Sequence, residues 1–161
     1  MLFRSEVSGT SGPVAPDNVF GFDTTNASGN DILALPSAVI AANTGVVNGT
    51  DIANGTTTTI KSHSISGGVI TFATADDGTG AVLINSTNLK AATGYLNTNM
   101  GVGQTVAFNY DADGNGFADT QYVYQKSGNQ NGASNDTLVA LRGVVGTTLG
   151  SAEGLHVVQI A

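Results

Sequence analysis

Short apolar runs separated by polar turns rich in glycine, asparagine and threonine recur along the whole chain. Alternation of apolar and polar positions over a few residues predicts β-strands. Gly67 and Gly68 form a two-residue link that predicts a hairpin. The strands are predicted at Ile32–Leu35, Ile60–Ser66, Val69–Ala73, Ala81–Ile84, residues 106–110, residues 122–124, Thr137–Leu141 and Leu155–Ile160.

Helical spacing of apolar residues is confined to two segments. The first is Ser86–Met100, where Leu89, Ala92, Tyr95, Leu96 and Met100 recur at helical intervals before Gly101. The second is a short segment that starts at Ser37, a residue type that caps helices, and ends near Gly45. The predicted fold class is therefore mostly β: an antiparallel two-sheet sandwich or roll of about seven short strands with one or two short helices.

No change in composition divides the chain into two folding units. Residues 1–18 are polar, contain Pro13 and Pro16, and are interpreted as a flexible N-terminal arm. This arm is either an assembly contact or, in part, a linker foreign to the native protein. Residues 19–161 are predicted to form a single β-rich domain.

Composition and charge exclude several classes of protein. The absence of cysteine excludes disulfides, thiol catalysis and thiolate metal sites. The net charge of −7 repels phosphate backbones, so no nucleic-acid partner is expected. No apolar run approaches the roughly 20 residues needed to cross a bilayer, so no membrane insertion is expected. Nearly all of the acidity comes from aspartate, which points to cation binding as the chemistry to examine.

The segment between the predicted strands at 106–110 and 122–124 has the spacing of a calcium-binding loop. Asp111, Asp113, Asn115 and Asp119 fall at its first, third, fifth and ninth positions. The carbonyl of Phe117 falls at the seventh position, which contributes a main-chain oxygen. Calcium takes six to eight oxygen ligands, and this loop turns alternate side chains towards one centre. A hairpin turn without a metal is the alternative interpretation.

The twelfth position of the loop is Tyr122 instead of the usual bidentate glutamate, so a further carboxylate is expected from elsewhere. Asp136 and Asp31 are the candidates for that role. A second candidate for cation binding is a group of acidic and amide side chains that precedes the first predicted strand. Helix caps or Asx-turns are the alternative explanation for this group. This group comprises Asp17, Asp23, Asn26, Asn30 and Asp31.

Catalytic and sugar-binding patterns are weaker. His63 and His156 each lie in a strand-like run, and no Gly-x-Ser-x-Gly nucleophile motif is present, so no enzymatic activity is expected. Tyr110, Tyr122 and Tyr124 either pack in the core or form a strip on which sugars stack. The strip makes a carbohydrate-binding module, with surface glycans as partners, the alternative function.

The segments GNDILAL, IKSHSISGGVITF, YDADGNGFADTQYVYQ and SNDTLVAL carry a family resemblance. From Val19 to Ala161 the chain resembles C-terminal domains of bacterial surface proteins exported by type I secretion, the RTX, S-layer and large-adhesin group. The resemblance implies export without a cleaved N-terminal signal and folding on external calcium. It also implies calcium ligation by the four loop residues and, in addition, by Asp31 and Asp136.

The expected function follows from these points. The first twelve residues contain no apolar stretch of the 7–15 residues found in signal peptides. At 161 residues the chain, taken as a whole protein, is too short for a large adhesin. We therefore expect a calcium-stabilised structural protein of the bacterial cell surface that self-assembles into a layer or filament. Strand addition is the expected mode of assembly, with Leu2–Val14 as the contact.

Overall fold

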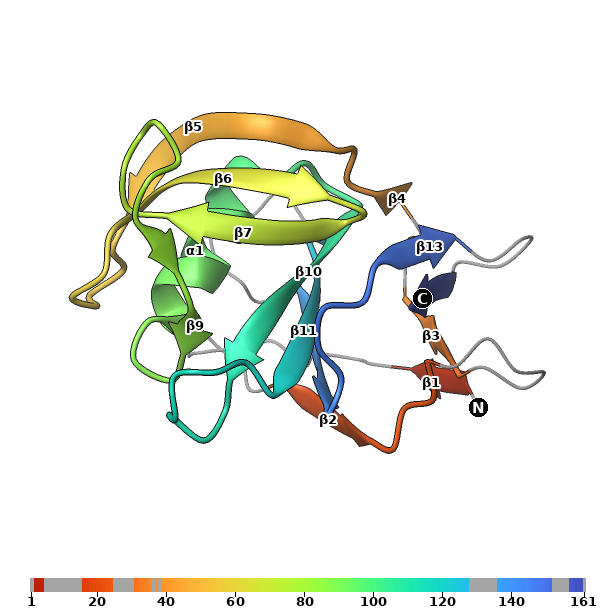
Figure 1. Cartoon of the computed structure of the whole chain (residues 1–161). Helices are drawn as coiled ribbons and strands as arrows, with labels where there is room; N and C mark the ends of the chain where they lie inside the picture. Colours follow the sequence, from red (N-terminus) through yellow and green to blue (C-terminus); the bar gives the residue numbers. More distant parts are fainter. Residues whose placement is uncertain are drawn as a thin grey trace.

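In the part of the chain that the structure describes, the fold combines two β-sheets and one helix (Figure 1). The structure is a computed structural model that describes residues 2–4, 16–24, 31–35, 37, 39–127, 136–151 and 157–160. Within these residues nearly all regular structure is strand, which confirms the prediction of a mostly β fold.

The larger sheet is a continuous path of strands with three short strands attached to it. Its path runs from β2 (Asp17–Phe20) through β12 (Thr137–Arg142), β11 (Thr120–Gln125), β10 (Gln104–Asp111), β7 (Val69–Ala73) and β6 (Ile60–Ser66) to β5 (Thr44–Ile52). The attached strands are β4 (Val39–Ile40), β8 (Ala81–Val82) and β9 (Ile84–Asn85). β4 and β9 pair with β10, and β8 pairs with β7.

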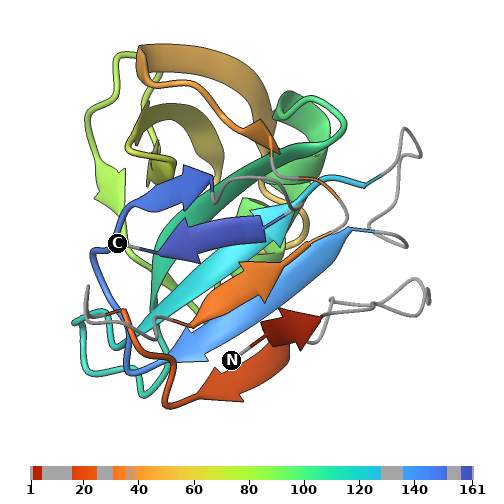
Figure 2. The same ribbon diagram turned by 90° about the vertical axis from the view of Figure 1, so that its right-hand side faces the viewer.

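The smaller sheet has four strands and packs beside the larger one. Its order is β1 (Leu2–Arg4), β3 (Ile32–Ala34), β14 (Val157–Ile160) and β13 (Leu149–Ser151). Figure 2 shows this sheet in front of β11 and β12. β1 runs parallel to β3, whereas the other two pairs of this sheet are antiparallel.

The prediction of purely antiparallel pairing was wrong, because both sheets are mixed. β10 runs parallel to β4, β7 and β9, and β12 runs parallel to β2. Hairpins join β5, β6 and β7, and another hairpin joins β10 to β11, so these neighbours are antiparallel. A long connection that contains the helix returns the chain from β7 to β10 in the parallel direction, as crossovers do.

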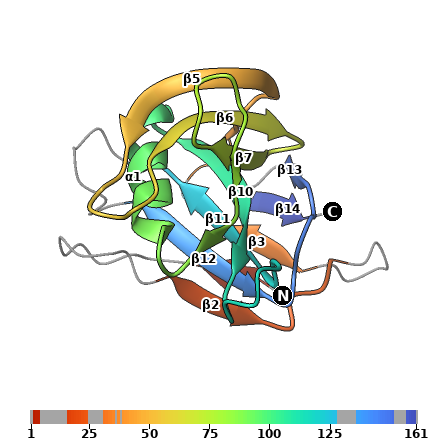
Figure 3. The same cartoon turned by 60° about the vertical axis from the view of Figure 1, so that its left-hand side comes forward.

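The helix α1 (Leu89–Asn99) confirms the longer of the two helix predictions. Figure 3 shows it beside the strands of the larger sheet. Its buried residues, Ala91, Ala92, Tyr95 and Leu96, lie on one face at the predicted intervals. In the described part of the chain, no helix has the length and apolar character needed to span a membrane.

The central strands of the larger sheet are buried on both faces, which explains the continuous burial of β11 and of β12 up to its last residue. Successive side chains of a strand point to opposite faces. Phe108, Tyr122 and Tyr124 therefore join a core with α1. Ala107 and Val123 join a second core with residues of the smaller sheet and its flanks, including Leu33, Leu35 and Leu149.

Two local predictions at the N-terminal side differ from the structure. The short helix expected from Ser37 is wrong: residues 39–40 form β4, and the Ala41 N–H donates to the Thr105 carbonyl (3.0 Å). Pairing with β10 thus replaces the hydrogen bonds that a helix would have formed at residues 39–41. Residues 1–18 were expected to be a flexible arm, but residues 2–4 form β1 and residues 17–20 form β2. Residues 1 and 5–15 lie outside the described residues.

The edge strand β5 is held to α1 by polar contacts. The Thr50 N–H donates to Asn99 Oδ1 (2.7 Å), and Asn99 Nδ2 donates to the Thr50 carbonyl (3.2 Å). Gly49 lies against this contact: a Cβ added there would stand 2.8 Å from Asn99 Oδ1 and would also overlap the Tyr95 hydroxyl. Any side chain at position 49 must therefore displace the residues that hold β5.

Gly49→Ala is expected to lower the free energy of unfolding by about 1–3 kcal/mol, the usual cost of overpacking. Gly45→Ala is the matched control, because Gly45 lies on the same strand with nothing within 4 Å of an added Cβ. Urea denaturation of both variants measures the difference. Equal stability of the two variants would show that Gly49 is not constrained by Tyr95 and Asn99.

Candidate metal centre

The acidic loop predicted from the sequence joins the central strands β10 and β11. Asp111 is the last residue of β10, and Thr120 is the first of β11. The Asp119 N–H donates to the Tyr110 carbonyl (3.1 Å) and closes the base of the loop. Gly114 and Gly116 have φ angles of 77° and 89°, in the region that favours glycine. The glycines of the motif thus allow the tight winding of this loop.

Asp111 organises the loop through its carboxylate. Its Oδ1 accepts from the N–H groups of Gly114 (2.7 Å) and Asn115 (3.2 Å), and its Oδ2 accepts from the N–H of Gly116 (2.9 Å). Asp111 is only 3 % exposed, so these bonds lie largely out of water. The chain is wound around this carboxylate. Each oxygen carries two lone pairs, so Oδ2, which accepts a single hydrogen bond, keeps one lone pair for another ligand.

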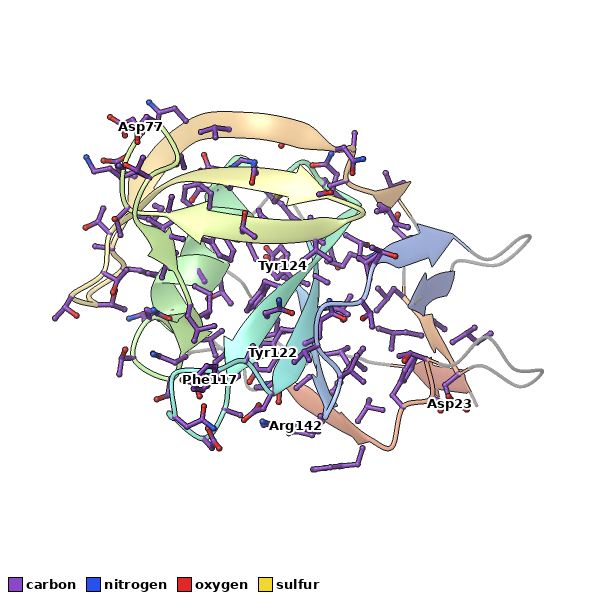
Figure 4. All side chains as sticks on the ribbon, in the orientation of Figure 1. Asp23, Asp77, Phe117, Tyr122, Tyr124 and Arg142 are labelled. Atoms are coloured by element: carbon purple, nitrogen blue, oxygen red, sulfur yellow. The ribbon has the colours of Figure 1, made fainter. Side chains whose placement is uncertain are left out.

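Three carboxylates converge in this loop. Asp111, Asp113 and Asp119 each offer an oxygen, and these oxygens lie within 4.8 Å of one another. Oxygens bound to one calcium ion at about 2.4 Å are separated by at most about 4.8 Å. The spacing therefore suits a shared hard cation. Figure 4 shows the loop at the lower left, next to the label of Phe117.

The other loop side chains are oriented by short-range hydrogen bonds. Asp113 Oδ1 accepts from the Asn115 N–H (3.1 Å), and Asn115 Nδ2 donates to Asp113 Oδ2 (2.9 Å). Asn115 Oδ1 accepts from the Phe117 N–H (2.8 Å). Asp119 Oδ1 accepts from the Thr120 hydroxyl (2.7 Å) and the Ala112 N–H (3.3 Å). Thr120 was not among the predicted site residues, although its place next to Asp119 in the sequence is a usable signal.

Two tyrosines lie on the strands that flank the loop. The rings of Tyr110 and Tyr122 stack with centroids 4.3 Å apart and planes 16° from parallel. Burial, with a smaller contribution from the neighbouring Tyr110, raises the pKa of Tyr122 to about 12. The residue at the twelfth loop position is thus a buried, neutral packing residue. It supplies no carboxylate to the loop.

The structure does not bring Asp136 to the loop. Asp136 precedes β12, where Thr137 pairs with Gln125 at the far end of β11. The loop adjoins Thr120 at the near end, and five strand residues span on the order of 17 Å. Asp136 is instead buried beside α1, where it accepts from Asn97 Nδ2 (2.7 Å) and the Ser127 N–H (3.0 Å). These hydrogen bonds join the helix to the residues that follow β11.

Asp23 and Asp31 also lie away from the loop. The Asp23 N–H donates to Asp31 Oδ2 (3.1 Å), and the Asp31 N–H donates to the Asp23 carbonyl (3.1 Å). These bonds tie together the chain segments on either side of residues 25–30, between β2 and β3. Figure 4 shows Asp23 beside the smaller sheet, across the molecule from Phe117. Asn26 and Asn30 of the same predicted group lie outside the described residues.

Phe117 and the histidines complete the set of predicted positions. The Phe117 side chain is 77 % exposed, and ligation by its carbonyl stays a prediction. His63 faces α1, with its Nδ1 2.9 Å from the Tyr95 hydroxyl. Burial lowers the pKa of His63, which favours the neutral ring. His156 lies outside the described residues.

The tyrosines proposed as a sugar-binding strip are core residues. Tyr110, Tyr122 and Tyr124 are 6 %, 2 % and 1 % exposed. A sugar ring stacks only on an accessible aromatic face, so these three residues offer it no platform. The packing interpretation therefore accounts for them, and the carbohydrate-binding alternative loses the feature on which it was based.

Comparison of the chain with protein-family models, with curated proteins and with solved structures found no match in any of the three. The functional argument therefore rests on the residues and their geometry.

The donor set of the loop fits a hard divalent cation. Carboxylate, amide and main-chain oxygens are the ligands that calcium and magnesium prefer, and the loop offers no sulfur or imidazole. Calcium tolerates irregular, flexible geometry and long ligand distances, whereas magnesium demands near-octahedral geometry at about 2.1 Å. The three carboxylates therefore suit a hard divalent cation, and they do not by themselves select between these two ions.

Proposed function

We propose that this chain is a calcium-binding structural domain of an extracellular bacterial surface protein that assembles with further copies of itself. The observation that carries the proposal is the convergence of the carboxylates of Asp111, Asp113 and Asp119 on a loop wound around Asp111. Three carboxylates at this spacing repel one another until a cation neutralises them. The loop is held in place by main-chain donors, so it is ready to bind before the ion arrives.

The location outside the cell follows from the affinity expected of such a site. Extracellular calcium modules typically bind with dissociation constants of about 10⁻⁴–10⁻³ M. Cytosolic calcium is far too low to fill a site of that affinity, so the domain gains its calcium only after export. Export by the type I route, which needs no cleaved N-terminal signal, is consistent with this sequence of events and forms part of the proposal.

Self-assembly is the role that we assign to the calcium-loaded domain. The net charge of −7 opposes association of identical chains, and bound calcium reduces this repulsion. β1, at the edge of the smaller sheet, belongs to the segment Leu2–Val14 predicted to make the contact, and β2 follows that segment at an edge of the larger sheet. Strand addition at an open sheet edge supplies main-chain hydrogen bonds between copies.

A thermal denaturation series tests the proposal. Calcium at about 100 times its dissociation constant adds about 2.7 kcal/mol to the stability of a protein that binds it only when folded. We expect the melting temperature to rise with calcium and to fall back when a chelator is added, with a smaller rise for magnesium. Light scattering of the same samples reports association. Equal melting temperatures with calcium and with chelator would contradict the proposal.

A further inference from the structure

Strand β1 lies at the outer edge of the smaller sheet (Figure 1). In the part of the chain that the structure describes, it pairs with β3 alone. The pairing is parallel and matches Leu2 with Ile32, Phe3 with Leu33 and Arg4 with Ala34. No hairpin joins the two strands, because the chain passes from β1 to the larger sheet and forms β2 before it reaches β3. β1 is therefore held in its place by the pairing and not by a tight turn.

The edge of β3 that β1 covers needs a strand. β3 lies between β1 and β14, and its central residue, Leu33, is fully buried in the second core. Without β1, the main-chain groups on this side of β3 would lose their partners. An open edge of this kind is a template for another strand. Each copy of the domain therefore requires a strand at this edge, and Leu2–Arg4 is the segment whose register fits it.

We propose that β1 of one copy pairs with β3 of the next copy, in place of that copy's own β1. This inference rests on the self-assembly proposed above, and it specifies the strand that is donated and the edge that receives it. The donated strand forms the same parallel register with the neighbouring copy, so the exchange keeps every hydrogen bond of the pair. In strand addition at an open edge, by contrast, β1 stays on its own β3.

The chain between β1 and β2 is long enough to connect two copies. Residues 5–16 separate the two strands, and twelve residues reach at most about 40 Å. A compact chain of 161 residues has a radius of gyration of about 15 Å. β2 can therefore stay in the larger sheet of its own copy while β1 lies on an adjacent copy.

The exchange builds an open chain of copies. The donated strand and the receiving edge are different surfaces of one copy, so the contact is heterologous and repeats without closing. The copy's own β1 competes at an effective concentration on the order of 1 mM, as short flexible links do. We therefore expect chains where copies are crowded to that level, as on a cell surface, and closed monomers in dilute solution.

Single-cysteine variants test the exchange, because the chain itself contains no cysteine. Arg4→Cys and Ala34→Cys each place one thiol at one of two register partners. Neighbouring strands lie about 4.8 Å apart, a separation that a disulfide can bridge. Mixed at about 1 mM with calcium and then oxidised, the two variants are expected to form a covalent heterodimer. Ala81→Cys takes the place of Ala34→Cys in the control, because Ala81 is an exposed strand residue of the larger sheet.

A double variant tests the same contact in the opposite direction. Arg4→Cys with Ala34→Cys in one chain, oxidised in dilute solution, fixes β1 on its own β3. We expect this closed form to lose the calcium-dependent rise in light scattering and to regain it on reduction. A chain that lacks residues 1–4 is measured beside it, since it accepts a strand but donates none. A small amount of this shortened chain should reduce the length of the assemblies that the unmodified protein forms.

Two results would overturn the exchange. One is a heterodimer yield no higher than that of the Ala81→Cys control while calcium still causes association. The other is undiminished association of the oxidised double variant. Either result would leave the proposed function intact and would indicate strand addition at an open edge instead. If the unmodified protein shows no calcium-dependent association at 1 mM, the proposed self-assembly is itself contradicted, and the exchange with it.

Discussion

Asp111→Ala is expected to lower the free energy of unfolding by about 3 kcal/mol without calcium and to abolish the calcium-dependent rise in melting temperature. The first effect arises because the N–H groups of Gly114, Asn115 and Gly116 lose their acceptor in a partly buried loop. Each buried donor without a partner costs about 1–3 kcal/mol, and partial access of water reduces the sum. The second effect arises because the most buried of the three converging carboxylates is removed.

Chemical denaturation and thermal melting, each with calcium and with chelator, separate the two effects. Asp77→Ala is the matched control: Asp77 is an exposed loop aspartate that accepts from the N–H and hydroxyl of Thr79, outside the cluster. It should cost less than about 1 kcal/mol and leave the calcium response intact. Asp111→Asn keeps an acceptor for the loop but lowers its charge. A full calcium response in Asp111→Ala would exclude the loop as the binding site.

Asp136→Ala is expected to lower the free energy of unfolding by about 3 kcal/mol while leaving the calcium response unchanged. The carboxylate accepts hydrogen bonds from Asn97, Ser127 and Tyr124, and its removal leaves these donors without a partner beside the helix. Burial, followed by the hydrogen bond to Asp136, raises the pKa of Tyr124, so its hydroxyl stays protonated and must donate elsewhere.

The same melting series with calcium and chelator measures both quantities for Asp136→Ala. A loss of the calcium response comparable to that of Asp111→Ala would place Asp136 at the ion, as the sequence suggested, and would contradict its position at the far end of β11. A fall in stability with an unchanged calcium response would show that Asp111 and Asp136, which lie near opposite ends of β11, have separate roles.

The carboxylate loop was predictable from the sequence because its residues are neighbours in the chain. Asp111, Asp113 and Asp119 lie within nine consecutive residues, and a glycine-containing hairpin turns such residues towards one centre whatever surrounds it. The helix at Leu89–Asn99 was predictable for a similar reason, since its apolar spacing is local. Local pattern and local geometry agree in both cases.

The remainder depended on contacts between distant segments. Asp136 is a residue type that can ligate a metal. Whether it lies near Asp111 or near Asn97 is decided by the end of β11 that it adjoins. Residues 37–43 have a helical composition, yet residues 39–40 pair in parallel with β10, and the Ala41 N–H donates to the Thr105 carbonyl. The parallel pairs themselves arise from long connections, and no short sequence motif specifies them.

The stacked pair of Tyr110 and Tyr122 has a spectroscopic consequence. The chain contains no tryptophan and only four tyrosines, and two of those four stack face to face on the strands that flank the carboxylate loop. Tyrosine emission is therefore not masked by a brighter indole, and half of the emitting rings lie on the two strands that flank the carboxylate loop. These two rings are therefore an optical reporter for the proposed calcium site, which can be titrated on the unlabelled and unmutated protein.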